Sequence, residues 1–183
     1  MSSTGSVGGR DRLRLFCALR LPGDVLDAIE AWQHADLSGG RIVPREHLHV
    51  TLAFLGSRPA PELDGIAGAL REAAAGAGEI VFSAARYRET RSVGMAVLRD
   101  ETGEGGRLAE ALFDRLEQLG VYEREQRPWL PHVTVLRFRT PPRLDPPVPE
   151  LGPFRPSDAA VYMSALRPTG AQYEVLESVP LGG

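Results

Sequence analysis

Two strand-like stretches, far apart in the chain, carry the same pattern of a histidine followed two residues later by a threonine. They are residues 47–56, HLHVTLAFLG, and residues 131–135, PHVTV. Because side chains alternate between the two faces of a β-strand, each histidine and its threonine are predicted to share a polar face that something polar must occupy. In the first stretch the residues predicted to face the core are Leu48, Val50, Leu52 and Phe54, and those predicted on the polar face are His47, His49, Thr51 and Ala53.

The composition is that of a globular protein without a large basic surface. With 183 residues, 43% of them hydrophobic, the chain is long enough to bury a sizeable core. Its formal net charge of −3 argues against a protein that grips a long nucleic-acid backbone, because such a protein needs clustered basic residues to displace counterions. A small phosphorylated ligand is compatible with this charge.

Cysteine content and hydropathy favour a cytoplasmic protein. The one cysteine, Cys17, lies in an apolar run and is interpreted as a small buried hydrophobic residue. The sequence contains no run of about 18 apolar residues, so it predicts no membrane span. Residues 1–11 begin with a Ser/Gly-rich stretch that lacks the apolar segment of a signal peptide, so we expect a disordered tail. We expect residues 12–183 to form a single domain, and the protein to be a monomer without a membrane partner.

Hydrophobic periodicity and the Gly and Pro positions divide the chain into strands and helices. The first part of the chain is predicted to run in the order strand, helix, histidine strand, helix, hairpin. The second part approximately repeats this order as helix, histidine strand, hairpin. We therefore expect an α+β fold of two pseudo-symmetric lobes, each an antiparallel sheet with helices on its outer face, and a groove between the lobes. The predicted strands are 13–19, 41–43, 47–56, 79–86, 92–98, 129–139, 159–166 and 173–180, the predicted helices are 24–35, 61–75 and 107–119, and the Pro-rich segment 141–156 is expected to be an extended loop.

Paired histidines and threonines suit the cleavage of a phosphodiester. This reaction needs a general base on the attacking side and a general acid on the leaving side, and two imidazoles with an ordinary pKa of about 6.5 can supply both at neutral pH. A threonine hydroxyl beside each can donate a hydrogen bond to a phosphoryl oxygen. No metal ion or other cofactor is required, since the sequence has no carboxylate cluster at ligand spacing, and His47 with His49 alone are two ligands short of a structural zinc site.

The two motifs resemble those of the 2H phosphoesterase superfamily, in the branch of bacterial RNA 2′,3′-cyclic phosphodiesterases, also called 2′-5′ RNA ligases. The resemblance rests on HVTLAFLG at residues 49–56 and PHVTVLR at residues 131–137, and it extends to the opening strand at 14–19 and the closing hairpin at 164–173. It implies a metal-independent hydrolase that opens a terminal 2′,3′-cyclic phosphate of RNA and leaves a 2′-phosphate. A ligase running in the reverse direction needs the same acid and base, so the direction stays open.

The resemblance also implies a role for each site residue. His49 would donate a proton to the departing ribose oxygen, and His132 would accept a proton from the attacking water. Thr51 and Thr134 would bind the phosphate, and Arg137 would contact the phosphate or the nucleotide. Strict alternation nevertheless places Arg137 on the face opposite the second histidine and threonine, so only a bulge or a strong twist would return it to the site.

Two other functions are compatible with the same residues. One is a non-catalytic module that binds RNA ends or nucleotides, and turnover of a cyclic nucleotide in a chelator would distinguish it. The other is a 2H enzyme that acts on another phosphodiester, such as a cyclic ADP-ribose phosphate, and a comparison with cyclic-phosphate-ended RNA would distinguish that. Solvated surface is the default interpretation of His47, Arg41, Arg45 and Arg127, and a core position is the default for Trp129, Tyr162 and Tyr173.

Overall fold

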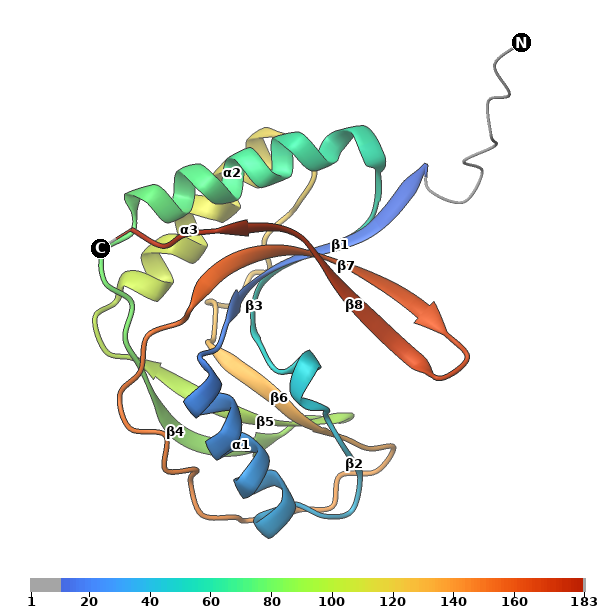
Figure 1. The fold of residues 1–183 in the computed structure, drawn as a ribbon, viewed down its shortest axis with the longest axis vertical. Coiled ribbons are helices and arrows are strands. Elements are labelled where there is room, and N and C mark those ends of the chain that lie inside the picture. The colour runs from blue at the N-terminus through green and yellow to red at the C-terminus, as the bar shows by residue number, and fades with distance from the viewer. Residues whose placement is uncertain (1–10, 183) are drawn as a thin grey trace.

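The described part of the chain, residues 11–182 of a computed structural model, contains one antiparallel β-sheet and three α-helices (Figure 1). Its eight strands follow the spatial order β4-β5-β6-β3-β1-β7-β8, with β2 paired to β6. The predicted tail, residues 1–11, lies outside the described residues except for Asp11. The strands are β1 (Arg12–Arg20), β2 (Arg41–Ile42), β3 (Val50–Pro59), β4 (Phe82–Glu89), β5 (Val93–Asp100), β6 (His132–Arg137), β7 (Asp158–Arg167) and β8 (Gly170–Val179).

The sheet has two lobes that join at one position. Strands β4, β5, β6 and β2 form one lobe, and β3, β1, β7 and β8 form the other. Between them, β3 and β6 share a single paired position, Val50 with Val133, which we call the seam. Figure 1 shows the sheet curling away from this seam on both sides. Since every strand pairing is antiparallel, the expected α+β fold with two antiparallel lobes is confirmed.

The helices lie on the outer faces of the lobes, as their apolar spacing predicts. Helix α1 (Gly23–Asp36) covers the lobe of β4 to β6, where the ring of Trp32 lies 6.1 Å from that of Tyr87. Helices α2 (Leu63–Gly76) and α3 (Glu104–Gln118) lie side by side over the other lobe (Figure 1). This arrangement leaves the opposite face of the seam for polar side chains.

The first histidine stretch differs from the predicted strand at both ends. Arg45–His47 form a short 3-10 helix, and β3 starts only at Val50. Further on, Ala53 is buried and Phe54 is 65% exposed, the reverse of the prediction. The reason is an irregularity in the pairing of β3 with β1, which skips Leu52. Such a bulge inverts the alternation of the residues that follow it.

The third predicted helix starts three residues earlier than expected, at Glu104 instead of Arg107. Gly103, Gly105 and Gly106 are poor helix formers, which is why the sequence favours the later start. In the structure, the carboxylate of Asp100 accepts hydrogen bonds from the backbone N–H groups of Gly103 at 3.2 Å and Gly106 at 2.7 Å. These bonds occupy donors that the first turn of a helix leaves without a backbone partner, which explains the early start.

A buried glutamine on α1 provides a stability prediction. Gln33 is 1% exposed, and its Nε2 donates hydrogen bonds to the carbonyl oxygens of Val43 at 3.0 Å and Val135 at 2.9 Å. The substitution Gln33→Leu removes this donor from both carbonyls, so the free energy of unfolding, measured by urea denaturation, should fall by about 1–3 kcal/mol. The exposed neighbour His34 offers a control, since His34→Ala should change it by less than about 0.5 kcal/mol. Equal stability of Gln33→Leu and the wild type would contradict the prediction.

Candidate active site

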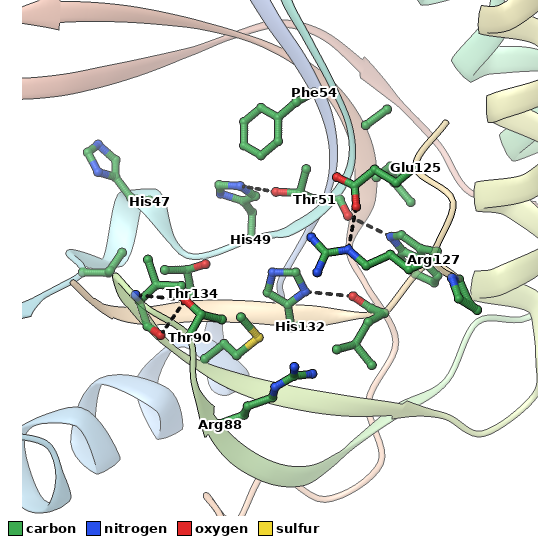
Figure 2. A pocket seen from close by; sticks show the side chains of 18 of the residues that line it. His47, His49, Thr51, Phe54, Arg88, Thr90, Glu125, Arg127, His132 and Thr134 are labelled. Atoms are coloured by element: carbon green, nitrogen blue, oxygen red, sulfur yellow. Dashed lines mark hydrogen bonds and ion pairs between the residues drawn. The ribbon is translucent and has the colours of Figure 1, made fainter. Parts of the chain in front are cut away.

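The seam places the two histidine–threonine pairs on one side of the sheet. Val50 and Val133 are both fully buried, so their neighbours along each strand point to the opposite face. Continuing the antiparallel register sets each histidine across from the threonine of the other motif. Figure 2 shows these side chains around one space. They are His49, Thr51, His132 and Thr134.

These four side chains line a groove with a volume of about 910 Å³. Arg137 lines it too, so the structure brings all five predicted site residues together. Further walls come from β4, β5, β8 and the segment between α3 and β6. Phe54, Arg86 and Arg88 also line the groove, although none of them is predicted from the sequence to do so. Arg86 is the last residue of the predicted strand 79–86, whereas Arg88 lies beyond it and only the observed β4 contains both. Their two-residue spacing was the available signal.

The hydrogen bond of His132 determines which ring nitrogen carries the proton. Its Nδ1 lies 2.8 Å from the carbonyl oxygen of Leu130. Because a carbonyl oxygen can only accept, Nδ1 must carry the hydrogen, and the neutral ring keeps a lone pair on Nε2. Figure 2 shows the rest of the ring directed toward His49 and Thr51. The geometry therefore suits a proton acceptor.

His49 is held in a less polar setting. Its ring centroid lies 5.1 Å from that of Phe16, and its Nε2 lies 3.0 Å from Oγ1 of Thr51. Burial lowers the pKa of His49 to about 4, although a hydrogen bond to the backbone of His47 opposes the shift. The charge of nearby basic side chains, including Arg137, lowers this pKa further. At pH 7 the ring is therefore neutral until an anion in the groove favours its protonation.

Arg137 reaches the groove because of a bulge in β6. The pairing of β5 with β6 passes from Leu136 to Thr134 and skips Val135. Val135 and Leu136 are both fully buried, so the alternation shifts by one residue and Arg137 turns back to the groove. The position expected from strict alternation is therefore wrong. Gln33 donates its hydrogen bond to the Val135 carbonyl and so supports the bulge from α1.

The aromatic residues divide between core and groove. Tyr162 is 7% exposed and stacks on Phe16 with 4.9 Å between ring centroids, as expected for a core residue. Trp129 and Tyr173 instead line the groove. The indole N–H of Trp129 donates a hydrogen bond of 3.0 Å to the backbone oxygen of Thr51, which ties the segment before β6 to β3. Both side chains are partly buried and also pack against buried core residues, so the core interpretation holds in part.

The remaining candidate residues differ in whether they line the groove. His47 lines the groove with its ring 4.3 Å from that of Tyr173, and burial lowers its pKa. Arg127 lines the groove as well, where Nε donates to Glu125 at 2.8 Å (Figure 2). Arg45 does not line the groove, because its guanidinium pairs with carboxylates of α1.

Two features are absent from residues 11–182. Within this range no three His, Cys, Asp or Glu side chains gather as a metal ion would require. None of the helices described there has both the length and the apolar character needed to cross a bilayer.

Comparisons with known proteins agree on one family. The chain is 33% identical to a curated RNA 2′,3′-cyclic phosphodiesterase of Thermus thermophilus over 93% of this chain and 91% of the relative. It is 32% identical to an Escherichia coli protein of the same name over 68% of this chain and 71% of the relative.

Solved structures have the same fold. A crystal structure of a Thermus thermophilus protein superposes with a TM-score of 0.79 at 32% identity, covering 93% of this chain and 99% of the other. The Escherichia coli protein LigT also gives 0.79, at 22% identity, over 94% and 99% of the two chains. The model of the 2′-5′ RNA ligase superfamily matches residues 21–161, so the chain belongs to this superfamily.

Proposed function

We propose that this protein hydrolyses the 2′,3′-cyclic phosphate at the end of an RNA chain and leaves a 2′-phosphate. The observation that carries the proposal is the pair of identical histidine–threonine motifs that flank the seam and line one groove. The names of the curated relatives, at 33% and 32% identity, support the substrate class.

In the proposed reaction, His132 accepts a proton and His49 donates one. Nε2 of His132 takes a proton from water as the water oxygen attacks phosphorus, in keeping with the Nδ1–H bond to Leu130. The bond between phosphorus and the ribose 3′ oxygen then breaks, and protonated His49 gives its proton to that oxygen. One proton is gained and one is lost, so proton exchange with solvent restores both rings.

The threonines and Arg137 are proposed to bind the phosphoryl oxygens. Thr51 and Thr134 lie on opposite sides of the seam, so each hydroxyl can donate to a different non-bridging oxygen. In the free protein Thr51 Oγ1 and His49 Nε2 hydrogen-bond to each other at 3.0 Å. A phosphoryl oxygen between them would accept from both groups once His49 is protonated. Arg137, which lies on β6 like Thr134, adds a permanent positive charge to the groove.

The same proton transfers also suit ligation. An RNA 5′-hydroxyl in place of water would form a 2′-5′ phosphodiester, which agrees with the name of the superfamily. All the proposed site residues come from one chain, so we expect a monomer to be active. RNA ends in the cytoplasm are the expected substrate.

Removing the proton acceptor should abolish most of the turnover. With His132→Ala, kcat for an oligoribonucleotide that ends in a 2′,3′-cyclic phosphate should fall by about 10²- to 10⁴-fold. Chromatographic separation of the 2′-phosphate product measures the rate. The matched control His34→Ala removes an exposed histidine of α1 and should keep wild-type turnover. Wild-type turnover by correctly folded His132→Ala would refute the role of this residue.

The proposed mechanism uses no metal ligand, so chelation should leave the rate unchanged. Turnover of the same oligonucleotide is compared before and after dialysis against EDTA, with and without added Mg²⁺, Mn²⁺ or Zn²⁺. An activity that disappears on dialysis and returns with one of these ions would contradict acid–base catalysis by histidines alone.

Anion binding should be coupled to proton uptake by His49. The pKa of the free ring is lowered to about 4, and a bound anion raises it, so sulfate should bind more tightly as the pH falls from about 8 to about 5. One proton taken up corresponds to at most about a tenfold change in Kd per pH unit. Isothermal titration calorimetry in buffers of different ionisation enthalpy measures both quantities. His49→Gln should show a shallower dependence, and identical curves for the two proteins would argue against the coupling.

A further inference from the structure

Two arginines on β4 face the groove beside the proposed catalytic residues. The register of β4, β5 and β6 lines up Arg86 with Val97 and His132, and Arg88 with Met95 and Thr134. Residues paired across neighbouring strands point to the same face of a sheet. Both arginines line the groove, and Figure 2 shows Arg88 on β4 below His132.

The side chains on the other face of β4 do not neutralise these arginines. Tyr87 packs against α1 and donates a hydrogen bond of 2.8 Å to Glu89. The Glu89 carboxylate also accepts hydrogen bonds from backbone N–H groups of the Pro-rich segment. Within residues 11–182, neither Arg86 nor Arg88 forms an ion pair of 4.0 Å or less.

The groove has a charge opposite to that of the whole protein. The chain has a formal net charge of −3, whereas four arginines and only two glutamates line the groove. One of these glutamates, Glu125, is paired with Arg127, and the other, Glu123, lies on the segment between α3 and β6. Exposed guanidinium groups in such a setting attract a polyanion and can hold a phosphate with two parallel hydrogen bonds.

The position of Arg86 and Arg88 separates them from the reacting phosphate. Two strand spacings, about 10 Å at the backbone, lie between β4 and β6. Met95 lines the groove between Arg88 and Thr134. The two guanidinium groups therefore face a part of the groove beside the histidines and threonines. A ligand longer than one nucleotide would place its next phosphate there.

We propose that Arg86 and Arg88 form a second phosphate subsite, which binds the phosphodiester on the 5′ side of the terminal nucleotide. This inference rests on the proposed function and adds to it that the preferred substrate is an oligonucleotide rather than a cyclic mononucleotide. Arginine suits such a role because its charge is permanent and its planar group matches two phosphate oxygens.

The test removes the charge from the substrate and from the protein in turn. The substrates are a 2′,3′-cyclic mononucleotide, a dinucleotide with the same cyclic end, and that dinucleotide with a neutral methylphosphonate linkage. The proteins are the wild type, the double variant Arg86→Gln/Arg88→Gln, and the control Arg14→Gln/Arg71→Gln, which loses the same charge from exposed positions on β1 and α2 outside the groove. The quantity compared is kcat/KM.

In the wild type, kcat/KM should be about tenfold or more higher for the charged dinucleotide than for its methylphosphonate analogue. In the double variant this ratio should fall toward one. The methylphosphonate linkage and the arginine substitutions remove the same interaction between phosphate and guanidinium, so the neutral linkage has nothing further to remove. The control should keep the wild-type ratio. The slope of log(kcat/KM) against log salt for the charged dinucleotide should also be less steep in the double variant, by about 0.7 for one phosphate contact.

A wild-type ratio near one, or a ratio that survives in the double variant, would overturn the subsite. If the mononucleotide is still hydrolysed in that case, the proposed function stands without it. Failure of the wild type to hydrolyse any of the three substrates would overturn the proposed function as well.

Discussion

The single strand pairing between Val50 and Val133 is the contact on which the site depends. It joins two antiparallel lobes into one sheet, and both valines are fully buried on the core side. A register shift of one residue would turn the valines to the groove and the histidines to the core. Since the pairing is antiparallel, the two motifs run in opposite directions and each imidazole lies across from the threonine of the other motif. This geometry supports the proposal that one imidazole acts as acid and the other as base on a phosphate bound between them.

Departures from regular strand geometry complete the groove. A bulge at Leu52 turns Phe54 outward, and a bulge at Val135 turns Arg137 to the groove. The second bulge has a specific support, because the buried amide of Gln33 on α1 bonds to its carbonyl. A residue on the outer helix thus contributes to the position of an arginine on the other side of the sheet.

Burial and charge give the two histidines different properties. The Nδ1–H of His132 is engaged by a backbone carbonyl, which leaves Nε2 as the acceptor. His49 packs against Phe16, and burial lowers its pKa to about 4. Protonation of His49 therefore depends on the arrival of an anion, and the arginines of the groove favour that arrival in a chain whose net charge is negative. Two residues of one type thereby become suited to opposite steps of proton transfer.

The sequence by itself determined the class of fold and the chemistry of the site. Apolar periodicity located the strands and helices because burial of one face imposes it, and the repeated histidine–threonine pair indicated phosphodiester chemistry because few other side chains exchange protons near neutral pH. Only the tertiary structure decided the faces of Phe54 and Arg137 and the place of Arg86 and Arg88 beside the second histidine. The physical reason is that a bulge and a cross-strand neighbour depend on the register with a partner strand, which the local spacing of residues does not contain.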